Sequence, residues 1–87
     1  MGDRRYVLDG PVAVIGRSRE ADCVVDDHNV SRKHAELRRD SSGDWQVVDL
    51  GSTNGVKVNG RRVDSSRLAP GDDVALGTMR FVFDLEH

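Results

Sequence analysis

The sequence has little cysteine and no long hydrophobic run, and each absence excludes a class of protein. Its single cysteine, Cys23, cannot form an internal disulfide, which argues against a disulfide-stapled secreted domain. No apolar stretch is long enough to cross a bilayer as a helix, and the sequence shows no signal-peptide pattern. We therefore expect a cytoplasmic location.

An excess of charge of one sign is lacking too. Thirteen Lys and Arg residues stand against fifteen Asp and Glu residues, and the net charge is -2. Aromatic residues make up only 5% of the chain, and the pairs Arg38-Arg39 and Arg61-Arg62 have acidic residues near them, as solvated surfaces do. We expect neither nucleic acid nor membrane as a partner, because any anion binding must be local.

The chain is short enough for only one domain. With 87 residues it can bury one modest core. We place this domain at residues 4–84 and expect it to be a monomer in isolation. Residues 1–3 and 85–87 are expected to come from cloning, since Leu85-Glu86-His87 matches the start of a histidine tag.

Short apolar runs separated by turn signals predict an all-β fold, a sandwich or a barrel. Asn59-Gly60 lies between two such runs and is a strong hairpin signal, because a tight hairpin turn needs positive φ at both central residues. The runs cover residues 6–8, 12–15, 23–25, 45–50, 56–58, 61–63, 74–76 and 79–85.

Residues 31–40 are ambiguous. They are rich in good helix formers, and Ser31 could be a helix N-cap. A strand would alternate poorly, with His34, Glu36 and Arg38 on one face. The pattern of this segment alone leaves helix and strand open.

Three polar loops, at residues 16–19, 28–34 and 51–55, hold the chemically interesting side chains. A phosphate dianion needs an arginine fork for two oxygens and hydroxyl or amide donors for the others. The side-chain amide of Asn54 could pair with both the N–H and the C=O of an extended peptide. The loops therefore suggest a phosphopeptide site, and their cationic and hydroxyl side chains include Arg17, Arg19, Arg32, Lys33, Ser31, Ser52 and Thr53.

The order and spacing of four motifs resemble those of the forkhead-associated (FHA) domain family. The motifs are Gly16-Arg17, Ser31-Arg32-Lys33-His34, Gly51-Ser52-Thr53-Asn54-Gly55 and Val58-Asn59-Gly60. The resemblance runs from about Tyr6 to Asp84. It implies a sandwich of two antiparallel sheets with roughly eleven short strands and with the binding loops at one end, which makes the ambiguous segment a strand.

The resemblance also implies roles for individual residues. Arg17 and the Ser31 hydroxyl would bind phosphate, Arg32 would add a contact beside it, Thr53 would line the phosphothreonine pocket, and Asn54 would hold the ligand main chain. The family's structural positions correspond to Gly16, His34 and Gly55, and selectivity for other ligand residues could reside in Arg19, Asn29 and Lys33.

The resemblance predicts a phosphothreonine-dependent protein-binding module downstream of a serine/threonine kinase, with no cofactor. The rival interpretation is a scaffold of the same family that pairs with a partner through a sheet face, independently of phosphate.

The sequence gives little support for an enzyme or for a metal-binding protein. Ser31 and His34 are not accompanied by a nucleophile-elbow motif, so an enzyme is not expected. Cys23, His28 and His34 lack the spacing of a metal site.

Overall fold

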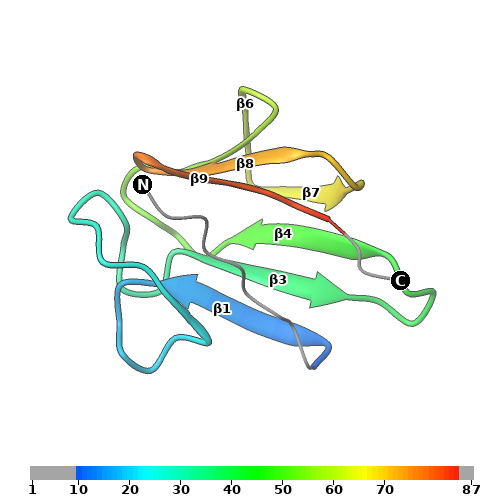
Figure 1. Cartoon of the computed structure of the whole chain (residues 1–87), viewed down its shortest axis with the longest axis horizontal. Helices are drawn as coiled ribbons and strands as arrows, with labels where there is room; N and C mark the ends of the chain where they lie inside the picture. The colour runs from blue at the N-terminus through cyan, green and yellow to red at the C-terminus, as the bar shows by residue number, and fades with distance from the viewer. Residues whose placement is uncertain (1–9, 85–87) are drawn as a thin grey trace.

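Two β-sheets pack face to face to form the molecule, as Figure 1 shows for a computed structural model that describes residues 10–84. The first sheet has the strand order β2-β1-β3-β4-β7 and the second has the order β6-β5-β8-β9. The strands are β1 (Val12–Gly16), β2 (Cys23–Val24), β3 (Ala35–Arg39), β4 (Trp45–Asp49), β5 (Val56–Val58), β6 (Arg61–Val63), β7 (Ser65–Leu68), β8 (Asp73–Leu76) and β9 (Met79–Val82).

The all-β sandwich expected from the sequence is confirmed. The structure shows nine strands within residues 10–84, whereas the resemblance implied roughly eleven. The predicted strand at residues 6–8 lies outside the described residues. All strand pairs are antiparallel except β1 with β2, which run parallel over two residues. Strand β7 was not predicted.

The ambiguous segment is a strand, as the resemblance implied. Strand β3 pairs with β1 on one side and with β4 on the other. Its inward residues Ala35 and Leu37 are buried, whereas Arg38 and Arg39 are exposed. Two flanking ladders and a buried face therefore outweigh the helix propensity of these residues.

The core lies between the two sheets and consists mostly of small aliphatic side chains. Val47 from the first sheet and Val56, Val74 and Leu76 from the second are fully buried. The Trp45 ring lies 6.3 Å from the Phe83 ring at a tilted angle, so the two aromatic rings close one part of the core. Among residues 10–84 we find no helix with the length and apolarity that a membrane span needs.

The hairpin between β5 and β6 turns at the predicted Asn-Gly pair. Asn59 has a φ of 51° and Gly60 a φ of 85°, as a tight two-residue hairpin requires. The Asn59 side-chain oxygen accepts a hydrogen bond from the Asp73 amide at 3.0 Å, and the Asn59 amide donates to the Asp73 carbonyl at 2.7 Å. These bonds fix the hairpin to the start of β8.

Three loops and one hairpin turn gather at the same end of the sandwich, on the left in Figure 1. They are the β1–β2 loop (residues 17–22), the β2–β3 loop (residues 25–34), the β4–β5 loop (residues 50–55) and the β8–β9 turn (residues 77–78). We call this the loop end. It contains all three polar loops that the sequence singled out.

Truncation of Val74 tests the core, and Val82 on the neighbouring strand supplies a matched control. Val74 is fully buried, whereas Val82 is 65% exposed. Val74→Ala should lower the free energy of unfolding by about 2 kcal/mol, and Val82→Ala should change it by less than about 0.5 kcal/mol. Urea denaturation of both variants measures this. Equal losses would contradict the assignment of inner and outer faces.

Candidate functional site

The β1–β2 loop lies directly against the β2–β3 loop. The Arg17 amide donates to the Ser31 carbonyl at 3.0 Å, and the Ser18 amide donates to the Arg32 carbonyl at 3.0 Å. At Gly16 a Cβ atom would lie only 2.0 Å from the Arg32 carbonyl oxygen, so a side chain would push the loops apart. The close contact therefore explains why glycine precedes Arg17.

A serine side chain joins the β2–β3 loop to the β4–β5 loop. The Thr53 amide donates to the Ser31 Oγ at 3.1 Å. Because this oxygen acts as an acceptor there, the hydroxyl hydrogen of Ser31 can still donate to an anion. Thr53 is exposed, and its backbone lies beside the Ser31 side chain.

His34 holds the β2–β3 and β4–β5 loops together from the interior of the molecule. Its side chain is fully buried, and its Nδ1 accepts a hydrogen bond from the Ser31 amide at 3.0 Å. Its Nε2 lies 2.7 Å from the Gly55 carbonyl oxygen. An N–H must donate to Nδ1 and a carbonyl can only accept, so the ring is neutral with its proton on Nε2. His34 thereby connects two loops without exposure to solvent.

Glycine at position 55 suits this contact. Its φ is 79°, a conformation that side chains disfavour. The Gly55 amide donates a hydrogen bond to the Ser52 hydroxyl at 2.9 Å. The backbone at residue 55 is thus held on both sides, by Ser52 and by His34.

Asn54 is anchored by one half of its side-chain amide. Its Nδ2 donates to the Asn29 carbonyl at 2.7 Å. This bond leaves the side-chain oxygen available to accept from the main-chain N–H of a ligand. Asn54 is exposed, so a ligand at the edge of the site can reach this side chain.

A second polar network supports Asn29. Thr78 donates its hydroxyl to Asp27 at 2.6 Å, and the Asn29 side chain lies 3.4 Å from the same hydroxyl. The Asn29 amide donates to the other Asp27 oxygen at 2.8 Å. The Thr78 hydrogen bond, followed by that of the Asn29 amide, lowers the pKa of Asp27 below its usual value.

Asp27 and Thr78 were not predicted as functional residues. The spacing Asp27-x-Asn29 is a signal for a local side-chain turn and could have indicated the first contact. The contact with Thr78 crosses 51 residues and needs the tertiary structure.

The predicted ligand-binding residues Arg17, Ser31, Arg32, Thr53 and Asn54 all lie at the loop end, linked by the contacts above. Arg17 and Arg32 are exposed, and neither forms an ion pair with any residue that the structure describes. Arg19 and Lys33 are exposed on the same loops, and their part in selectivity stays a prediction.

No group of three or more His, Cys, Asp or Glu residues within 10–84 is arranged to hold a metal ion. Burial of the Cys23 thiol raises its pKa, so this cysteine is a core residue with little thiolate character.

Comparisons with known proteins agree with this geometry. The family model described as FHA domain matches residues 13–77. The chain is 49% identical over 79 residues to the glycogen accumulation regulator GarA of Mycolicibacterium smegmatis, covering 91% of this chain and 49% of the relative. It is 47% identical to the oxoglutarate dehydrogenase inhibitor of Corynebacterium diphtheriae, covering 91% of this chain and 54% of that protein. The chain thus spans about half the length of these relatives.

A solved structure of an FHA domain has the same fold. It comes from a structural and functional analysis of phosphothreonine-dependent FHA domain interactions. The two structures superpose with a TM-score of 0.89 at 36% sequence identity, over 97% of this chain and 86% of the other.

Loss of the buried histidine should destabilise the domain. His34→Ala removes two hydrogen-bond partners and leaves a cavity, so the free energy of unfolding should fall by about 3 kcal/mol. His28→Ala removes an exposed histidine from the same loop and should cost less than about 0.5 kcal/mol. Thermal and urea unfolding compare the two variants. If His34→Ala is as stable as the parent domain, His34 does not hold the loops together.

The Asp27 network predicts a pH dependence. Because the folded state lowers the pKa of Asp27, this carboxylate contributes stability above about pH 4, and the contribution is lost as pH falls through the lowered pKa. Thr78→Val removes the hydroxyl donor, so the pKa of Asp27 should rise toward its usual value. An NMR titration of the Asp27 carboxyl carbon measures this, and an unchanged pKa in the variant would show that the Thr78 bond has no such effect.

Proposed function

The chain belongs to the FHA domain family, and we propose that it binds protein segments containing phosphothreonine through Arg17, Ser31, Arg32, Thr53 and Asn54. It is a binding module and not an enzyme. The observation that carries the proposal is the junction at Ser31. There one residue accepts the Arg17 amide on its carbonyl and the Thr53 amide on its hydroxyl, and so brings three loops to one point.

A phosphate at this junction meets the donors that its charge requires. Arg17 supplies a guanidinium fork, and the Ser31 hydroxyl hydrogen donates to a second phosphate oxygen. Thr53, whose amide bonds to Ser31, adds a hydroxyl, and Arg32, the next residue in the chain after Ser31, adds a further positive charge. No proton transfer or covalent step is involved, so binding is reversible and needs no cofactor.

The main chain of the ligand lies at Asn54. The side-chain oxygen of Asn54 accepts from a ligand N–H, while Asn29 holds the amide nitrogen in place. A main-chain contact of this kind favours an extended ligand whatever its side chains are. Selectivity for the rest of the ligand must therefore come from other residues around the site.

We place the domain in a regulatory protein that responds to a serine/threonine kinase. The relatives named above are a glycogen accumulation regulator and an oxoglutarate dehydrogenase inhibitor. The partner of this chain would be a protein phosphorylated on threonine, met in the cytoplasm, and the isolated domain would act as a monomer. With a net charge of -2, neither nucleic acid nor a membrane surface is a partner in this proposal.

The test is a binding measurement with three forms of one peptide. Fluorescence anisotropy with phosphothreonine, phosphoserine and unphosphorylated versions should give micromolar binding, about -8 kcal/mol, for the phosphothreonine form alone. Equal affinity for all three forms would point instead to a sheet face that binds a partner independently of phosphate.

Removal of the predicted phosphate ligand should weaken binding sharply. Arg17→Ala loses a charge-assisted pair of hydrogen bonds, so the Kd for the phosphothreonine peptide should rise by about tenfold or more. The control is Arg67→Ala, since Arg67 is another exposed arginine and lies on β7 of the five-stranded sheet. A similar change in both variants would mean that only the overall charge matters.

A further inference from the structure

A row of mostly cationic residues crosses the outer face of the four-stranded sheet. Arg62 lies opposite Lys57, Lys57 opposite Ala75, and Ala75 opposite Arg80. The neighbours of Lys57 and Ala75 on their own strands are buried in the core. Because successive side chains of a strand point to opposite faces, the row faces solvent.

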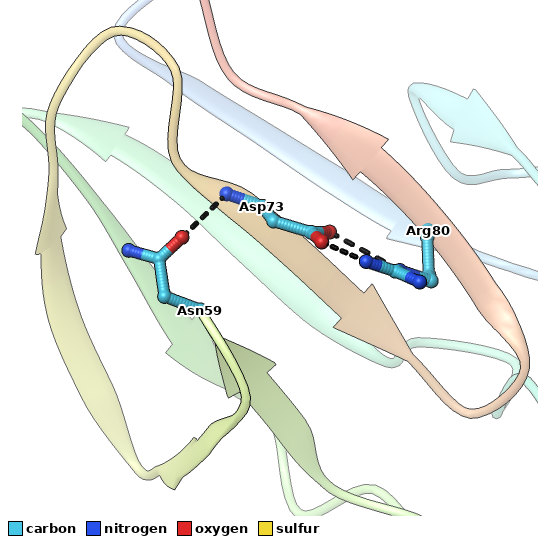
Figure 2. A network of polar contacts seen from close by, with 3 residues as sticks. All are labelled: Asn59, Asp73 and Arg80. Carbon is cyan, nitrogen blue, oxygen red and sulfur yellow. Dashed lines mark hydrogen bonds and ion pairs between the residues drawn. The ribbon is translucent and has the colours of Figure 1, made fainter.

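The two ends of this row differ in charge balance. Arg80 pairs with Asp73, which lies on the adjacent strand, as Figure 2 shows. The same pairing lowers the pKa of Asp73. At the other end, Lys57 and Arg62 form no ion pair with any residue between 10 and 84. Like charges directly opposite each other on neighbouring strands repel, so this pair is a cost to the free domain.

The unbalanced end adjoins the proposed ligand site. At Gly55 a Cβ atom would lie 2.8 Å from the Arg62 Nε, so the Arg62 guanidinium lies against the residue that follows Asn54. Lys57 comes three residues after Asn54. At about 3.3 Å per residue, an extended ligand held at Asn54 reaches Lys57 within about three of its own residues.

A hollow continues from the site onto this face. It has a volume of about 220 Å³, and its lining includes Asn29, Asn54, Lys57, Ala75 and Thr78, whereas Arg62 is not part of it. Ala75, the small member of the row, leaves space beside Lys57. The hollow is too small for a second domain but large enough for a side chain of the bound peptide.

We propose that Lys57 and Arg62 select an acidic side chain in the ligand, a few residues from the phosphothreonine. The proposal rests on the function proposed above and adds a rule for choosing among phosphothreonine sequences. A carboxylate between Lys57 and Arg62 relieves their repulsion and meets donors from both. Arg80 takes no part, because Asp73 already neutralises it.

The experiment measures a difference between peptides. Phosphothreonine peptides with alanine at all neighbouring positions are compared with peptides carrying one glutamate or one lysine at each position in turn, up to about four residues on either side. Fluorescence anisotropy should show about threefold to tenfold tighter binding for glutamate at one or two adjacent positions, and weaker binding for lysine there.

Variants assign the preference to residues. Lys57→Gln with Arg62→Gln should abolish the glutamate preference and leave affinity for the alanine peptide unchanged within about twofold. Arg67→Gln, a charge loss on the other sheet, should keep the full preference. Because the repulsion disappears, the double variant should also unfold at a temperature no lower than the parent domain.

The outcomes separate this inference from the proposed function. Binding of the alanine phosphothreonine peptide without any glutamate preference overturns the role of Lys57 and Arg62 alone. A preference that survives the double variant does the same. No binding to any phosphothreonine peptide overturns the proposed function itself.

Discussion

The hydrogen bonds of buried His34 are the contacts on which the loop end depends. The ring connects the Ser31 amide of one loop to the Gly55 carbonyl of another, and both contacts need the same neutral tautomer. A buried ring with both nitrogens bonded has no alternative position, so the two loops cannot shift independently. Ser31 is thereby presented to the Thr53 amide, and the Asn54 side chain is brought to the carbonyl of Asn29. The sandwich core is rigid, and His34 fixes to it the loops that carry the candidate ligand-binding residues.

Buried and exposed residues of the loop end have different roles. Gly16, His34 and Gly55 are buried and set the backbone, whereas Arg17, Arg32 and Asn54 are exposed and available to a ligand. The backbone that carries these side chains is therefore in place before a ligand arrives, so the ordering cost of binding falls mainly on the exposed side chains. The Asp27–Thr78 network extends the same principle to the β8–β9 turn. The cationic pair Lys57 and Arg62 lies next to this end, with the Arg62 guanidinium against Gly55, on strands β5 and β6 and not on a loop.

Much of the fold and of the site could be predicted from the sequence, and the failures have physical reasons. Turn signals and apolar runs located most strands, and Asn59-Gly60 fixed one hairpin. Strand β7 was missed because only Leu68 in it is buried, so it has almost no apolar pattern and forms by pairing with β4. The pattern at β3 left helix and strand open, because pairing on both sides decides the structure there. The motif residues were found by resemblance, but the Thr78 contact depends on tertiary structure. The pairing of Lys57 with Arg62 could have been predicted, since a two-residue turn at Asn59-Gly60 places them opposite each other.

The most direct test of the central claim is an NMR titration that follows every backbone amide as a phosphothreonine peptide is added. The largest shifts should occur at Arg17, Ser31, Arg32, Thr53 and Asn54, and the dephosphorylated peptide should cause none of them. Shifts centred on the outer faces of β3, β4 and β7, or shifts of equal size with the dephosphorylated peptide, would contradict it. Such a result would mean that the loop end is built as described but that the partner binds elsewhere.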